Sequence, residues 1–194
     1  MKKEESNLET SGIETEFYPS GKNVLLILTG IGGSVKGHQN KYQTIAETAV
    51  KNHGFSVCVV TMPQGSWECP EDIFRYAMSV VQAQVPDCGD VYAMGNSAGA
   101  TFLLWYAYLF PQIKKVLAIN PVLNVNLHRA NHGIRNFTGG KIFLAVGEKD
   151  ASNLFSEFLE GNQETSVIRL ENTDHYFTDN LGTFLSLPER LLFV

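Results

Sequence analysis

Short, mostly apolar runs alternate along this chain with longer segments in which apolar and polar residues are mixed. Runs of about four to eight apolar residues are typical of strands that are covered on both faces of a parallel sheet. We therefore expect strands over residues 23–28, 55–61, 90–94, 116–119, 142–146 and 167–170. Few apolar side chains precede them, so residues 1–20 are interpreted as an N-terminal extension in which 13–18 forms at most a short edge strand.

The segments between these runs repeat apolar residues at helical spacing. In the first of them Tyr42, Ile45 and Ala49 share one helix face, and Asn52-His53-Gly54 then gives a helix stop. The same reasoning predicts helices over residues 42–50, 71–85, 98–110, 152–159 and 177–187. Because right-handed crossovers turn such alternation into a parallel sheet, the predicted fold class is α/β. We expect a three-layer α/β/α architecture, with a mostly parallel sheet and helices on both faces.

Length and composition fit a single globular domain over residues 1–194. The chain is 44% hydrophobic and 18% charged, which is ordinary for a globular protein. Its net charge is −5, and its lysines and arginines are scattered rather than clustered. This pattern argues against a nucleic-acid partner or an anionic membrane surface.

Cysteine usage and the N-terminal residues predict a cytoplasmic protein. The three cysteines, Cys58, Cys69 and Cys88, cannot all pair within the chain, and they belong to no metal-ligand pattern. Residues 1–10 are polar and lack the apolar region of a signal peptide. No segment reaches the roughly 18 apolar residues of a membrane span.

A G-x-S-x-G motif lies between the strand expected over 90–94 and the helix expected over 98–110, and it reads Gly95-Asn96-Ser97-Ala98-Gly99. A serine on a sharp strand-to-helix turn is strained, and side chains at the two glycines would crowd the adjoining strand and helix. The turn would raise the Ser97 hydroxyl to a helix N-terminus, where developing negative charge is stabilised. The alternative is that Ser97 merely caps the helix.

On this motif and its context, the chain resembles the α/β-hydrolase superfamily over about residues 22–187. The resemblance implies a minimal α/β-hydrolase fold with Ser97 as nucleophile, followed along the chain by an acid and then a histidine. His175 lies in the polar loop between the last strand and the last helix, where the superfamily carries its base. The other histidines precede the nucleophile or the strand that delivers the acid: His38, His53, His128 and His132.

Asp150 is the acid that the resemblance favours, since similar hydrolases carry strand, glycine, two residues and aspartate at this point. Glu148 is the nearest rival, and Asp174 is disfavoured because it adjoins His175. The structural alternative for Asp150 is to cap the helix near Ser152. We expect that one residue does not easily serve both roles.

The resemblance also implies an oxyanion hole made of two backbone N–H groups, those of Ile31 and Ala98. Ile31 lies in a glycine-rich loop after the first buried strand, in which side chains are kept out of the space for the carbonyl oxygen. Many relatives have histidine where this chain has Thr29. The loop lacks the spacing of a phosphate-binding or dinucleotide-binding motif.

No metal or other cofactor is expected. His128 and His132 are four residues apart, but the glutamate of H-E-x-x-H and a third ligand are missing. The aromatics around Trp67 and Trp105 are interpreted as core or rim residues. Residues 121–140, where many relatives insert a lid, are too few for a large cap domain.

These residues predict a serine hydrolase that cleaves a carboxylic ester or thioester of a small substrate through an acyl-enzyme on Ser97. A peptidase would use the same groups. The alternative from another class is a non-catalytic small-molecule receptor on the same scaffold. A flavodoxin-like or nucleotide-binding domain would leave Ser97, Asp150 and His175 unexplained.

Overall fold

The computed structural model describes residues 12–159 and 164–194. Their strands form one seven-stranded sheet in the order β1-β3-β2-β4-β5-β6-β7. All neighbouring strands are parallel except β1 and β3, which pair antiparallel. The strands are β1 Thr15–Tyr18, β2 Val24–Ile31, β3 Ser56–Met62, β4 Val91–Asn96, β5 Ile113–Ile119, β6 Lys141–Gly147 and β7 Thr165–Leu170. The predicted sheet is therefore confirmed, as is the short edge strand.

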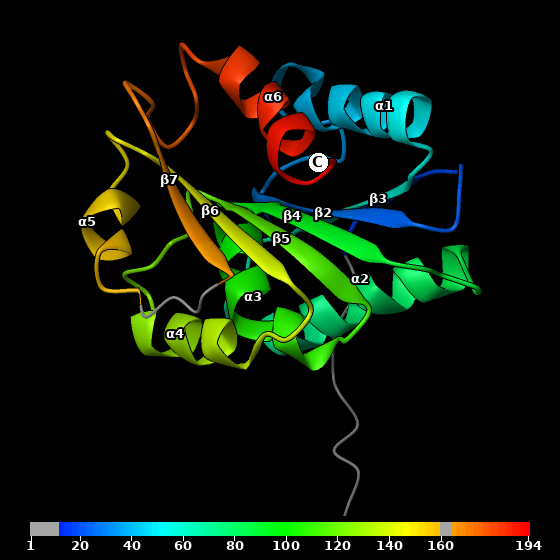
Figure 1. Cartoon of the computed structure of the whole chain (residues 1–194), viewed down its shortest axis with the longest axis horizontal. Coiled ribbons are helices and arrows are strands. Elements are labelled where there is room, and N and C mark those ends of the chain that lie inside the picture. Colours follow the sequence, from blue (N-terminus) through cyan, green and yellow to red (C-terminus); the bar gives the residue numbers. More distant parts are fainter. Residues whose placement is uncertain (1–11, 160–163) are drawn as a thin grey trace, which may run out of the picture.

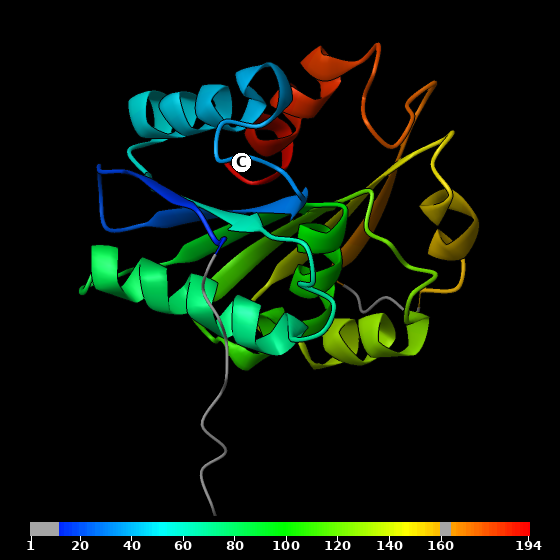
Figure 2. The ribbon, with the colours of Figure 1, turned by 180° about the vertical axis from the view of Figure 1, so that it is seen from behind.

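Helices cover both faces of the sheet, which confirms the three-layer prediction. Figures 1 and 2 show α1 and α6 on one face and α2, α3 and α4 on the other. The helices are α1 Lys41–His53, α2 Pro70–Gln84, α3 Ala98–Tyr106, α4 Leu127–Asn136, α5 Ser152–Ser156 and α6 Leu181–Leu191. Short 3-10 turns precede α1 and follow α3. No helix in the described part of the chain is long and apolar enough to cross a membrane.

The central strand β2 supplies both hydrophobic cores because successive side chains point to opposite faces. Leu26 and Leu28 pack into the core beneath α2 and α3, whereas Leu25 and Ile27 pack into the core beneath α1 and α6. All four side chains are fully buried. The continuous apolar run of this strand therefore reflects burial on two faces.

The order of the strands reverses at β2, which lies between β3 and β4. From β2 the chain moves outward to β3, and it then returns to β4 and proceeds through β5, β6 and β7 on the other side. Such a reversal leaves a crevice at the carboxyl ends of the two central strands, where ligands of doubly wound sheets bind. The glycine-rich loop after β2 and the turn after β4 both open into this crevice.

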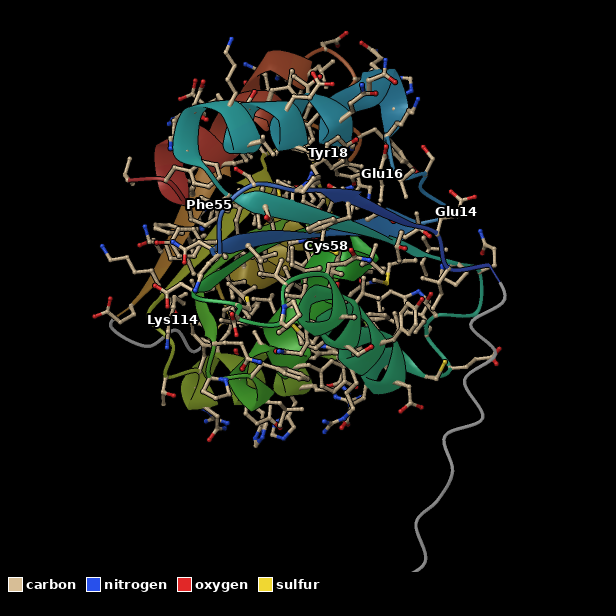
Figure 3. The ribbon with its side chains drawn as sticks, turned by 90° about the vertical axis from the view of Figure 1, so that its right-hand side faces the viewer. Glu14, Glu16, Tyr18, Phe55, Cys58 and Lys114 are labelled. Carbon is tan, nitrogen blue, oxygen red and sulfur yellow. The ribbon has the colours of Figure 1, made fainter. Side chains whose placement is uncertain are left out.

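The edge of the sheet at β1 carries charged side chains. Glu14 and Glu16 are labelled along this edge in Figure 3, with Tyr18 beyond them and Cys58 on the neighbouring strand. Charges on an edge strand oppose pairing with another chain. Residues 1–11 of the expected N-terminal extension lie outside the described residues.

Two helices differ most from prediction, while α3 and α5 only end earlier than expected, at Tyr106 and Ser156. The last helix was expected from residue 177 but begins at Leu181, because Phe177 has a left-handed φ of 58° and the Asp174 carboxylate binds Thr178 in the preceding turn. The helix α4 was not predicted, since Ile134 is the one large apolar residue among its buried residues and the others, Ala130, Asn131 and Gly133, are small or polar. Gly133 on this helix lies so close to α3 that a Cβ there would be 1.9 Å from the Leu104 carbonyl oxygen.

The position of α4 also explains the segment over residues 121–140. It packs against α3 in the outer layer of the sandwich, on the face away from α1 and α6 (Figure 1). This segment therefore builds the fold and forms no large lid.

Candidate active site

Ser97 occupies the sharp turn between β4 and α3. Its backbone has φ 55° and ψ −118°, a conformation that is strained for a residue with a side chain. A Cβ on Gly95 would lie 2.5 Å from the Gly99 carbonyl carbon, and a Cβ on Gly99 would lie 2.4 Å from the Leu28 carbonyl oxygen. Only glycine at both positions lets strand, turn and helix approach this closely.

The Ser97 side chain does not cap the helix that follows it. It makes no capping hydrogen bond to α3. Its hydroxyl oxygen instead lies 3.0 Å from Nε2 of His175. Thr101 stabilises the turn, because its hydroxyl donates a hydrogen bond to the Ser97 carbonyl and accepts one from the Val122 N–H. The capping alternative is therefore wrong.

His175 links Ser97 to Asp150. Nδ1 of the imidazole forms a hydrogen bond with Oδ2 of Asp150, while Nε2 faces the serine hydroxyl. The His175 side chain is about one-third exposed (32%), whereas only 2% of the Asp150 side chain is exposed. The acid is thus fixed in the protein, and the imidazole stands between it and the open pocket.

Both carboxylate oxygens of Asp150 form hydrogen bonds, one to His175 and one to the backbone of Ser152. Its Oδ2 atom binds His175, while Oδ1 accepts a 2.6 Å hydrogen bond from the backbone N–H of Ser152 at the start of α5. Asp150 is not the N-cap of α5, however, because Ala151 occupies that position and makes no side-chain cap hydrogen bond. Burial raises the pKa of Asp150, but the hydrogen bonds from His175 and Ser152 outweigh burial and hold it below its usual value.

The rival acids have other partners. Oε2 of Glu148 accepts from the Asn172 N–H, and both carboxylate oxygens of Asp174 bind Thr178. Both residues shape the loop that carries His175. Of the three acids considered, Asp150 is the one that contacts the imidazole.

Asn120 joins the acid and histidine loops, and sequence reasoning missed it. It is fully buried at the carboxyl end of β5, with a left-handed φ of 44°. Its amide nitrogen donates to the carbonyls of Asp174 (3.1 Å) and His175 (3.3 Å), and its oxygen accepts from Gly147 N–H (2.7 Å). A polar residue directly after a buried apolar run was the available signal.

The residues expected to form the oxyanion hole flank Ser97. Ile31 and Ala98 line the same pocket as Ser97 and His175. Ala98 is the first residue of α3, where backbone N–H groups have no partner within the helix. Gly30 and Ile31 belong to the end of β2, and a Cβ on Gly30 would lie 3.3 Å from the Ser97 Cβ, so this end of the strand adjoins Ser97 closely.

Thr29, which stands where many relatives have histidine, holds the glycine-rich loop in place. Its hydroxyl donates to the Gly30 carbonyl at 2.9 Å and accepts from the Met62 N–H at 3.1 Å. These bonds tie the end of β2 to β3 at the point where their register shifts. The side chain thus supports the loop without itself facing the pocket, since it is fully buried.

A pocket of about 420 Å³ opens beside Ser97. Trp67 forms part of its wall and is fixed by edge contacts with Phe102 and Trp105. Sequence reasoning set His38 aside because it precedes the nucleophile, yet it lines this pocket. Further lining residues were not predicted: Lys41, Tyr42, Val122, Val125 and Tyr176.

The described residues contain no group of three His, Cys, Asp or Glu side chains that could hold a metal ion. His132 packs edge-on against Tyr108, with 5.4 Å between ring centroids. Its histidine neighbour His128 lies on the same helix, at the surface layer of the sandwich. Both histidine side chains are exposed on the outer surface of α4.

A strained serine turn at the switch point of a doubly wound sheet, with an acid and a histidine after later strands, is the arrangement of the α/β-hydrolase fold. The chain has this fold, as the resemblance implied. No family model and no curated protein matches its sequence.

Solved structures agree with this assignment. Est1E from Butyrivibrio proteoclasticus has a TM-score of 0.73 at 10% identity, covering 92% of each chain. The monoacylglycerol lipase of Paleococcus ferrophilus has a TM-score of 0.69 at 12% identity, covering 89% of this chain and 95% of the lipase. An alpha-beta serine hydrolase homologue from Coxiella burnetii has a TM-score of 0.68 at 14% identity, covering 92% and 90%. At these identities the likeness shows the fold.

Proposed function

We propose that this chain is a serine hydrolase that cleaves a carboxylic ester or thioester of a small substrate. The observation that carries the proposal is the continuous hydrogen-bonded chain from Ser97 through His175 to Asp150. Because a buried acid holds the imidazole with one nitrogen toward the serine, the arrangement suits nucleophilic acyl transfer. Neighbours named as a lipase and as a serine hydrolase homologue support the same class of reaction.

In the first step the Ser97 hydroxyl attacks the carbonyl carbon of the substrate. Nε2 of His175 takes the hydroxyl proton, while Asp150 keeps the other ring nitrogen protonated and stabilises the imidazolium. The carbonyl oxygen becomes an oxyanion that accepts hydrogen bonds from the N–H groups of Ile31 and Ala98. Each such donor contributes about 3 kcal/mol to stabilising the transition state.

Collapse of this intermediate breaks the bond to the leaving group, and His175 gives its proton to the departing alkoxide or thiolate. Ser97 then carries the acyl group as an ester. Water attacks this ester with His175 again as base, the oxyanion forms and collapses once more, and the proton returns to Ser97. The substrate is thereby split into an acid and an alcohol or thiol.

Labelling with a fluorophosphonate probe tests the proposal. We expect the native protein to be labelled, and Ser97→Ala and His175→Ala to remain unlabelled while circular dichroism shows them folded. Ser34→Ala is the matched control. Ser34 lies beside Gly33 in the glycine-rich loop after β2, but it does not line the pocket beside Ser97. A folded native protein that resists the probe and leaves 4-nitrophenyl esters intact would favour the receptor alternative.

We also infer that the protein works in a reducing compartment, the cytoplasm. All three cysteines are free thiols, and burial raises the pKa of Cys58 to about 12. An unreactive buried thiol and two partly exposed ones fit an environment without disulfide formation. Maleimide labelling of the denatured protein, isolated from its own cells under acid quench, is expected to modify every cysteine.

A further inference from the structure

Lys41 forms part of the wall of the pocket that contains the candidate nucleophile. It is the first residue of α1, and its half-buried side chain lines the pocket that also holds Ser97 and His175. Its Nζ atom lies 4.2 Å from the ring centroid of Phe184 and 5.1 Å from that of Tyr42. Phe184 belongs to α6, which lies beside α1 on the same face of the sheet (Figure 1). Two aromatic rings therefore hold the amine in position.

No carboxylate in the described part of the chain pairs with Lys41. The first turn of α1 has no acidic side chain, and a cation is unfavourable at the positive end of a helix dipole. Burial lowers the pKa of Lys41 to about 8, so the amine is still mainly protonated at neutral pH. The protein thus holds a charge that its own fold does not neutralise.

A second cavity, of about 210 Å³, adjoins the pocket beside Ser97. The two cavities share His38, Lys41 and Tyr176 in their walls. Among the residues that the structure describes, no aspartate or glutamate lines either cavity, although the chain as a whole has a net charge of −5. At neutral pH the charge that Lys41 contributes to the walls of the two cavities is therefore positive.

From these observations we propose that the substrate is an ester that itself bears a carboxylate, and that Lys41 binds this group. The inference rests on the proposed hydrolase function and names its substrate class. The ammonium of Lys41 donates to the carboxylate, while the apolar walls at Trp67, Val122 and Val125 take an uncharged part of the substrate. Lys41 is thus a specificity-determining residue.

A single carboxylate fits this site better than a phosphate group. Phosphate carries up to two charges and is normally bound by several donors, such as arginine forks or a row of backbone N–H groups. Lys41 is the one lysine or arginine that lines the two cavities within the described residues. One ammonium matches one negative charge.

The test compares two pairs of esters that differ by the carboxylate. One pair is 4-acetoxybenzoate and 4-acetoxybenzamide, which places the charge on the leaving group. The other is the mono-4-nitrophenyl ester of glutarate and its methyl ester, which places the charge on the acyl group. The measured quantity is the ratio of kcat/KM for the charged ester to that for the neutral ester, so that differences in intrinsic reactivity cancel between variants.

We expect this ratio to fall on the order of tenfold in Lys41→Met for at least one pair, since a charge-assisted hydrogen bond is lost. Lys41→Arg keeps the charge and is expected to retain most of the preference. Lys36→Met is the matched control, because Lys36 is an exposed lysine of the preceding loop that lines neither cavity. An unchanged ratio in Lys41→Met for both pairs, with neutral esters still cleaved, overturns the inference and leaves the hydrolase intact.

A binding measurement decides the case in which no ester is cleaved and the proposed function fails. Saturation-transfer NMR would compare 4-hydroxybenzoate with 4-hydroxybenzamide on Ser97→Ala and on Ser97→Ala combined with Lys41→Met. Stronger binding of the carboxylate that disappears with Lys41 supports the anion site. Equal signals from both compounds, or a carboxylate signal that survives the loss of Lys41, reject it.

Discussion

At the scale of single residues, the groups that orient His175 matter as much as the groups that react. Asp150 fixes the imidazole from one side, and Asn120 fixes the backbone on which it stands. Asn120 forms hydrogen bonds with the acid and histidine loops and does not line the pocket, so we interpret it as a positioning residue. Because a displacement of about 1 Å in a reacting group costs up to 100-fold in rate, we expect the proposed catalysis to depend on this support.

Replacement of Asn120 by alanine is expected to lower kcat about 10–100-fold and the free energy of unfolding by roughly 2–4 kcal/mol. The variant leaves the Gly147 N–H and the carbonyls of the histidine loop without their partner. Ester turnover well below the melting temperature, with urea unfolding, measures both effects. Asn136→Ala, which removes an exposed bond within α4, is the control. A normal kcat in folded Asn120→Ala would contradict the role.

Protonation of Asp150 is expected to destabilise the fold at low pH. Its folded-state pKa is depressed, so its stabilisation is complete above the unfolded value of about 3.9 and is lost as pH falls through the folded value. Asp150→Asn is therefore expected to be less stable than the native protein at neutral pH, with the difference shrinking below about pH 4. Urea unfolding across this range measures it. The exposed Asp179→Asn serves as control, and a gap that stays constant as pH falls argues against the assignment.

The sequence predicted those site residues whose defining neighbours lie close to them along the chain. Ser97 could be predicted as the nucleophile because Gly95, Gly99 and the flanking strand and helix all lie within a few residues of it. Asp150 and His175 required the order that the resemblance implies, since 25 residues separate them. Asn120 and Lys41 were not found, because their partners lie on distant loops and helices that only the folded chain brings together.

At the scale of elements, backbone contacts between strand and helix decide the geometry of the serine turn. The apolar patterns predicted the strands well, because a buried strand is apolar on both faces. They failed at α4, where close backbone contact through Gly133 replaces a large apolar face. They also failed at the start of α6, where the left-handed φ of Phe177 delays the helix.

Gly99→Ala is expected to destabilise the protein by about 3 kcal/mol and to abolish fluorophosphonate labelling, because the new Cβ has no room. It would lie 2.4 Å from the Leu28 carbonyl oxygen and 2.5 Å from that of Thr29. Gly182→Ala in α6 is the matched control, since no atom lies within 4 Å of its added Cβ. That variant is expected to gain up to about 1 kcal/mol from helix propensity. Thermal denaturation measures both, and equal melting temperatures would refute the packing argument.

At the scale of the whole molecule, one end of the sheet carries the candidate site and the other end packs against the C-terminal residues. The carboxyl ends of β2, β4, β5, β6 and β7 carry the candidate site, as expected for a doubly wound sheet. The opposite end is closed by the C-terminal residues. The sequence predicted the layers and the end of the sheet that carries the candidate site. It did not predict how the C-terminal residues pack on the opposite end, because that packing depends on contacts between remote segments. A single domain over residues 1–194 stays a prediction.

Phe193 is the centre of this closure. Its ring stacks on His53 at 4.2 Å between centroids and contacts Phe55 at 5.1 Å and Tyr92 at 6.5 Å. Lys115 on β5 binds the carbonyls of Leu192 and Val194 on either side of it. These contacts join α1, β3, β4, β5 and the end of the chain.

Phe193→Ala is therefore expected to lower the free energy of unfolding by about 2–3 kcal/mol, because the aromatic cluster loses its shared member. The kcat/KM of the folded fraction is expected to stay unchanged, since the cluster lies at the end of the sheet away from Ser97. Urea unfolding and ester turnover on the same samples separate the two quantities. Phe158→Ala is the control for removing an aromatic ring, because Phe158 is 65% exposed. A parallel loss of stability and of kcat/KM would mean that the two ends of the sheet are coupled.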